Sequence, residues 1–240
     1  MAEPAAYYAR RGPWADWWTL LHPPYTAWHL SFVVIGACLA PHVVVSTLVG
    51  TLVAFFLAVG LAAHALDELH GRPLGTSIPS PVLAAVAGAS LAGALILGAV
   101  GVVRVGGWLV LFMAVGVGLV VGYDLELGGG AVHGGAGFAL GWGAFPVLTA
   151  AFAQTHSVTG GAVLAAGGAA AWSGAQRALS TPARTLRRRV RGAQVRLVHA
   201  DGTVDQVGRR ELLAPLEQAL RLSSWAAVLL AVGLAVSRLG

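Results

Sequence analysis

Residues 43–67 read VVVSTLVGTLVAFFLAVGLAAHALD, a run with no ionisable side chain before His64. A helix needs about 20 apolar residues to cross the hydrocarbon core of a bilayer, and this run is long enough. Of the 240 residues in the chain, 57% are hydrophobic and 10% are charged, and the mean hydropathy is +0.74. A soluble domain carries about 25% charged residues. The sequence therefore predicts an all-α polytopic membrane protein.

Further apolar runs of similar length divide the chain into membrane spans. We expect seven of them, at residues 25–41, 43–67, 81–103, 105–123, 132–154, 157–179 and 222–238. The expected organisation is an interfacial segment at 1–24, a six-helix membrane core at 25–180, a cytoplasmic Arg-rich insert at 181–221 and a seventh transmembrane helix at 222–240. Many small residues in these runs would let the helices pack closely in lipid.

The arginines predict the orientation of the spans. If the N-terminus is cytoplasmic, only Arg104 and Arg238 lie outside, and the other basic side chains lie inside. Because cytoplasmic loops of membrane proteins carry an excess of basic residues, we expect an integral, multi-pass protein whose N-terminus is cytoplasmic and whose C-terminus is outside.

The insert between the last two predicted spans has a pattern of its own. Residues Gln194 to His199 and Thr203 to Val207 alternate around Asp201-Gly202, which predicts a β-hairpin. An amphipathic helix is expected to follow, from Gly208 to Leu222. The arginine cluster at 184–191 either contacts anionic lipid headgroups, binds a diphosphate substrate or serves only as a topology signal.

Acidic and histidine side chains gather at the predicted cytoplasmic edge of the membrane core. Ionisable groups near a bilayer usually face the interior of the bundle and mark a functional site, and mixed His and carboxylate sets hold metals in helix bundles. Each of these side chains could also be a solvated helix end, but as a group they favour a catalytic or metal-binding pocket. The candidate metal ligands are His29, His64, Asp67, Glu68, His70, Asp124, Glu126 and His133.

Composition excludes several other kinds of chemistry. The single cysteine, Cys38, excludes a disulfide framework and a Cys-based zinc site. Every basic residue is Arg, so Schiff-base lysine chemistry and a P-loop are excluded as well. We expect no nucleic-acid partner; the expected partners are an isoprenoid or other membrane lipid and anionic lipid headgroups.

Two segments resemble the UbiA superfamily of intramembrane prenyltransferases. The stretch AHALDELHGRP at residues 63–73 resembles the first Asp-rich motif of that family, and residues 138–155, with WGAFPVL at 142–148, resemble the fifth helix of its menaquinone-pathway branch. The resemblance covers residues 20–185 and is diffuse. It implies a UbiA-like helical bundle in which Mg²⁺ ions bind an allylic diphosphate, and a prenyl group passes to an aromatic or other acceptor.

The chain departs from this family pattern at several positions. Asp67 matches a motif aspartate, whereas Ala63 and Gly71 stand where an asparagine and a later aspartate would be. The second motif is expected at residues 176–180, which contain no acid, and only Arg177 matches there. Seven predicted spans also replace the usual nine.

We therefore expect a metal-dependent, prenyltransferase-like enzyme that acts on an isoprenoid or other long-chain lipid at the cytoplasmic leaflet. Asp67 and Glu68 are the expected catalytic residues, and Arg72, Tyr123 and Arg177 are expected to bind substrate. The metal would be Mg²⁺ for prenyl transfer, and Fe, Mn or Zn if the histidines are ligands. Two alternatives stay open: a His/carboxylate transition-metal enzyme that oxidises or hydrolyses a lipid, and a non-catalytic lipid-binding or assembly subunit.

Overall fold

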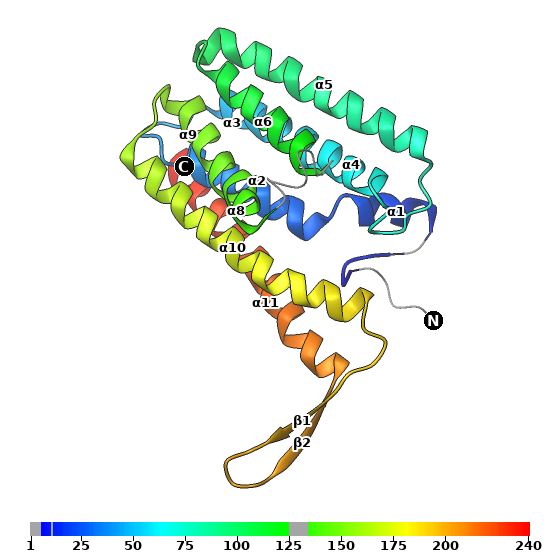
Figure 1. Ribbon diagram of the computed structural model, residues 1–240. Coiled ribbons are helices and arrows are strands. Elements are labelled where there is room, and N and C mark those ends of the chain that lie inside the picture. The colour runs from blue at the N-terminus through cyan, green and yellow to red at the C-terminus, as the bar shows by residue number, and fades with distance from the viewer. Residues whose placement is uncertain (1–5, 11, 125–133) are drawn as a thin grey trace.

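The computed structural model describes residues 6–10, 12–124 and 134–240. Most of this part is helical, and its strands form one two-stranded antiparallel hairpin (Figure 1). The first half contains α1 (Pro13–Leu20), α2 (Pro23–Ala37), α3 (Val45–Phe55), η1 (Phe56–Ala63), α4 (His64–Leu69), α5 (Ser80–Val105) and α6 (Leu109–Asp124). The second half contains α8 (Gly135–Ala139), η2 (Leu140–Ala144), α9 (Phe145–Thr155), α10 (Gly160–Arg188), β1 (Gln194–Val198), β2 (Val204–Gly208) and α11 (Arg209–Leu239).

Four helices in the described part of the chain are long and apolar enough to cross a membrane. They are Val45–Leu69, which joins α3, η1 and α4, Ser80–Val105, Gly135–Thr155, which joins α8, η2 and α9, and Arg209–Leu239. They indicate a membrane protein. Helix α6 is apolar but shorter, and α2 has 15 residues. The seven-span count and the orientation of the termini therefore stay predictions.

The predicted hairpin is confirmed. Gln194 pairs with Gly208 and Val198 with Val204, and Gly202 takes the left-handed conformation that the turn needs, with φ 84°. The hairpin projects away from the helices at the far ends of α10 and α11 (Figure 1). The expected boundary at 180/181 lies inside α10, and the one at 221/222 lies inside α11, so the insert continues the two helices that carry it.

Two glycines allow the helices around the core to approach at backbone distance. A Cβ atom on Gly36 would lie 2.3 Å from the carbonyl oxygen of Val147, where α2 crosses α9. A Cβ on Gly143 would lie 2.5 Å from the carbonyl oxygen of Ala169, where η2 meets α10. Larger side chains at these two positions would push the helices apart.

Two of the membrane helices contain a π-helical stretch, η1 in Val45–Leu69 and η2 in Gly135–Thr155. Such wide turns are rare and are frequent at functional sites. Val59 of η1 and Trp142 of η2 are buried in the same hydrophobic cluster, together with Val120 of α6. Both π-helical stretches thus contribute to one buried cluster, and Val59 and Trp142 also line the pocket described next.

Candidate functional site

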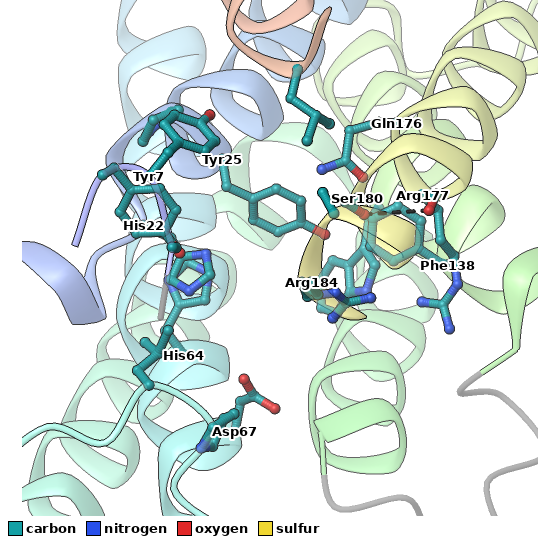
Figure 2. Close-up of a pocket in the computed structure, with 18 of the residues that line it drawn as sticks. Tyr7, His22, Tyr25, His64, Asp67, Phe138, Gln176, Arg177, Ser180 and Arg184 are labelled. Atoms are coloured by element: carbon teal, nitrogen blue, oxygen red, sulfur yellow. Dashed lines mark hydrogen bonds between the residues drawn. The ribbon is translucent and has the colours of Figure 1, made fainter. Parts of the chain in front are cut away.

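A pocket of about 350 Å³ lies among α2, α4, η2, α10 and the amino-terminal segment. Figure 2 shows its facing walls, with His22, His64 and Asp67 on one side and Gln176, Arg177, Ser180 and Arg184 on the other. The Tyr25 ring projects between the two walls. The pocket thus places an acidic and imidazole wall opposite a guanidinium wall.

Helix α4 supplies the acidic wall, because His64 and Asp67 are three residues apart and share a face. His64 Nδ1 lies 3.0 Å from the carbonyl oxygen of Gly60 and must donate to it, so in the neutral ring Nε2 is the acceptor. The Nε2 atom is buried and has no hydrogen-bond partner among the described residues. The His22 ring stacks on His64 at 4.7 Å between centroids. This wall therefore offers an unprotonated ring nitrogen beside a carboxylate.

Helix α10 supplies the basic wall. Arg177, Arg184, Arg187 and Arg188 all line the pocket. Arg177 donates to the Tyr123 hydroxyl at 2.6 Å, and its guanidinium lies 5.2 Å from the Phe138 ring. Arg187 Nε donates to Glu217 of α11 at 2.8 Å, which ties α10 to α11. Two of the predicted substrate-binding residues, Tyr123 and Arg177, are thus in contact with each other in the pocket.

Arg184 and Arg188 are one helical turn apart, which is a repulsive spacing for like charges. Partial burial and, next, the Arg184 charge lower the pKa of Arg188, while Tyr8 and Asp67 act against that shift. An anion between the two guanidiniums would remove the repulsion. Guanidinium groups bind phosphate with paired, charge-assisted hydrogen bonds.

The amino-terminal segment completes the pocket, although the sequence placed it only at the membrane interface. Tyr7 and Tyr8 line the pocket, and the Tyr8 ring lies 4.8 Å from the His22 ring. Burial raises the pKa of the Tyr8 hydroxyl well above 10, so this group stays a neutral donor. It has no hydrogen-bond partner among the described residues. Sequence reasoning missed Tyr8, His22 and Tyr25; their one signal was a concentration of aromatic side chains up to the start of the first membrane run.

Glu68 and Arg72, two of the predicted site residues that do not line this pocket, are used by a loop instead. The Glu68 carboxylate is 0% exposed and accepts hydrogen bonds from the backbone N–H groups of Leu74 and Thr76 and from the Thr76 hydroxyl, at 2.8–2.9 Å. Arg72 donates to the carbonyl of Ile78 and the hydroxyl of Ser80, both at 2.6 Å. Both side chains therefore fix the loop between α4 and α5.

The predicted metal ligands are divided among several places. His64, Asp67 and His70 line the pocket. His29 is buried, with Nδ1 2.8 Å from the carbonyl oxygen of Trp142 and its ring 4.4 Å from Tyr25. Glu126, His133 and the side chain of Asp124 lie outside the described residues.

Among the residues that the structure describes, no three His, Cys, Asp or Glu side chains form a group that could hold a metal ion. Because Glu126, His133 and the side chain of Asp124 lie outside the described residues, the divalent metal stays a prediction, and we assign no chemical step to one.

Comparison of the chain with protein-family models, with curated proteins and with solved structures found no match. The resemblance to the UbiA superfamily thus stays a prediction.

Proposed function

We propose that this protein is an intramembrane enzyme that binds a long-chain phosphate or diphosphate of the isoprenoid class and transfers its chain to an acceptor. One observation carries the proposal. Arg184 faces Asp67 across a pocket that Arg188 also lines, and the remaining walls include the aromatic rings of Tyr25, Phe138 and other residues. An anionic headgroup on an apolar chain matches this distribution of charge and apolar surface.

Guanidinium groups take the place of metal ions in this proposal. A diphosphate needs several positive charges, and Arg177, Arg184 and Arg188 supply them on one helix. Each charge-assisted hydrogen bond contributes about 1.5–3 kcal/mol. The seven-span topology that we propose, with the N-terminus inside, puts these charges at the cytoplasmic leaflet, where the substrate headgroup would lie.

The transfer step uses the two walls differently. The bond between the first carbon of the chain and the diphosphate oxygen breaks, and the diphosphate leaves with the electron pair on the guanidinium wall. The acceptor forms a new bond to that carbon and loses a proton, which Asp67 takes. His64 Nε2 and Gln176 Oε1 are buried and lack hydrogen-bond partners among the described residues. Both atoms can accept a hydrogen bond, so they suit a prenyl-acceptor molecule that carries an O–H or N–H group.

A binding assay on the purified full chain tests the headgroup assignment. The probes are geranylgeranyl diphosphate and the uncharged geranylgeraniol, added in detergent with a chelator present. We expect the diphosphate to bind more tightly than the alcohol. The double variant Arg184→Gln with Arg188→Gln should weaken diphosphate binding by about 100-fold or more, since each of the two lost contacts is worth at least about 1.5 kcal/mol. Arg196→Gln is the matched control, because Arg196 is exposed on the hairpin outside the pocket.

Three outcomes decide between the functions considered. If the chelator abolishes diphosphate binding, metal ions rather than arginines hold the headgroup. If the double variant binds like the control, the pocket is not the headgroup site. If binding follows the expectation but no acceptor carrying a hydroxyl is ever prenylated, the protein is the non-catalytic lipid-binding alternative.

A further inference from the structure

A second and larger cavity, of about 660 Å³, lies on the other side of the π-helical stretches. Helices α3, α5, α6 and α9 form its walls, and α5 lies at the outer edge of the bundle (Figure 1). Along the Val45–Leu69 helix it extends from Val45 to Val59, which is about 20 Å at 1.5 Å per residue. We call this cavity the apolar groove. The apolar groove is therefore longer than half the thickness of the hydrocarbon core, which is about 30 Å thick in all.

Glycines shape the groove in two ways. A Cβ atom on Gly98 would lie 2.7 Å from the end of Met113, and one on Gly101 would lie 2.9 Å from Leu109, so these glycines hold α5 against α6. Gly50 is different, because a Cβ there would meet no atom within 4 Å. Gly50 therefore borders open space in the groove, between helices that are otherwise tightly packed.

Of the described residues that line the groove, only Arg104 is charged, and the others are apolar or carry at most a hydroxyl or an indole N–H. Arg104 lies at the end where α3 begins and α5 stops. Arg104 is exposed, in the last turn of α5. A single cation at one end of an apolar groove of this length is complementary to one molecule with an anionic head and a hydrocarbon chain.

We propose that the apolar groove is a binding site for an anionic phospholipid, with one acyl chain along α3 and α5 and the phosphate at Arg104. This site is separate from the headgroup pocket. Arg104 is in the last turn of α5, whereas the pocket arginines lie on α10, and the predicted topology puts the two sets on opposite membrane faces. The lipid would therefore come from the leaflet opposite to the one that supplies the enzyme's substrate.

The two sites share a wall. Val59 and Trp142 line both the groove and the headgroup pocket. These residues belong to η1 and η2, so the π-helical stretches form the partition between the end of the acyl chain and the floor of the pocket. Because this partition separates the two cavities, the phospholipid and the substrate chain would bind as two distinct ligands.

Native mass spectrometry of the purified full chain tests the proposal, with dioleoyl phosphatidylglycerol and dioleoyl phosphatidylcholine as probes. We expect one phosphatidylglycerol molecule to be retained in preference to phosphatidylcholine. Arg104→Gln should reduce that preference by about fivefold, the value of one surface charge on an anionic lipid. Gly50→Leu should reduce retention of both lipids, because the new side chain occupies the groove.

The control variant is Gly88→Leu. Gly88 is also in a membrane helix, a Cβ there would also meet no atom within 4 Å, and it lines neither cavity. It should retain lipid as the wild type does.

The proposal fails if Gly50→Leu retains phosphatidylglycerol as well as Gly88→Leu does, or if Arg104→Gln leaves the preference unchanged. It also fails if Gly50→Leu weakens the binding of geranylgeranyl diphosphate as strongly as the binding of phosphatidylglycerol, because the groove would then hold the substrate chain. Loss of diphosphate binding in the wild type, with lipid retention as expected, would count only against the proposed enzyme function.

Discussion

Asp67 and Glu68 are neighbours in the chain, yet they serve two different regions of the molecule. Glu68 turns toward the α4–α5 loop, where its buried carboxylate accepts three hydrogen bonds. Asp67 turns toward the pocket and faces the guanidinium wall of α10. The two neighbouring acids therefore have different roles: Glu68 stabilises the fold, and Asp67 can contact a ligand.

The arginines divide in the same way. Arg72 donates to loop carbonyl and hydroxyl groups, with a left-handed φ of 53°, whereas Arg184 lines the pocket. A side chain whose hydrogen bonds are used by its own loop contributes to folding, and one that faces a cavity can contribute to binding. Variants on the loop side of α4 should therefore change stability, and variants on the pocket side should change ligand binding.

The largest effect on stability is expected from Glu68→Gln. The amide nitrogen would replace one acceptor oxygen and point at an N–H donor, so at least one buried hydrogen bond to a charged group is lost, at about 3 kcal/mol. Thermal unfolding can be followed by reaction of Cys38, the single cysteine, which is 3% exposed, with a thiol-reactive dye. Diphosphate binding at low temperature should be unchanged.

Glu211→Gln is the matched control for this change. Glu211 accepts one hydrogen bond, from the Gly208 N–H at the start of α11, at an exposed position. Its loss should destabilise the protein much less than Glu68→Gln does. An equal effect of the two variants would contradict the structural role given to Glu68.

Arg72→Lys should have a smaller effect in the same direction. A single ammonium group cannot reproduce the two guanidinium contacts to Ile78 and Ser80, and one lost hydrogen bond is worth about 1 kcal/mol. The melting temperature should fall without a change in diphosphate affinity. A weaker affinity in this variant would restore Arg72 to the substrate-binding role that its sequence position suggested.

The sequence was sufficient for the parts of the fold that depend on local pattern. Apolar run length located the four helices of the described part that are long enough to cross a membrane, and the alternation around Asp201-Gly202 predicted the hairpin. The π-helical stretches η1 and η2 could not be predicted, because their sequences are as apolar as the α-helical turns around them. They depend on how neighbouring helices pack.

The candidate site was predictable in composition but not in orientation. Helical spacing put His64, Asp67 and Glu68 together, but it could not predict that the Glu68 carboxylate would accept hydrogen bonds from the loop that follows His70. Tyr8 and His22 reach the pocket from an amino-terminal segment with no periodic pattern. Long-range contacts of this kind come from packing, which a single sequence does not reveal.

Acidification should destabilise the protein through His22, at the wall of the pocket. Burial, then the neighbouring His64 and the charges of Arg188 and Arg184, lower the pKa of His22 well below 6.5. Below an unfolded-state pKa of about 6.5 the unfolded chain takes up a proton that the folded chain does not, so stability falls as the pH drops.

The variant His22→Asn should show a shallower loss of stability between about pH 7 and pH 5, the range around the unfolded-state pKa of histidine. Asparagine tolerates the left-handed φ of 48° at this position. The measurement is thermal unfolding at several pH values for both proteins. Parallel curves for the two proteins would mean that His22 is not held neutral by the pocket.

The smallest effect on stability, together with the largest effect on function, is expected from Asp67→Asn. Asp67 is only partly buried and lines the pocket, so the isosteric amide should change the free energy of unfolding by less than about 1 kcal/mol. Removal of its negative charge from the wall opposite Arg184 should tighten geranylgeranyl diphosphate binding. Prenyl transfer to an acceptor should nevertheless fall by about 100-fold or more, because a positioned base contributes that much to proton removal. Glu68→Gln should show the reverse pattern, with lower stability and normal transfer per folded molecule. If Asp67→Asn lost stability and kept its transfer activity, the two acids would have exchanged the roles that the two sides of α4 give them.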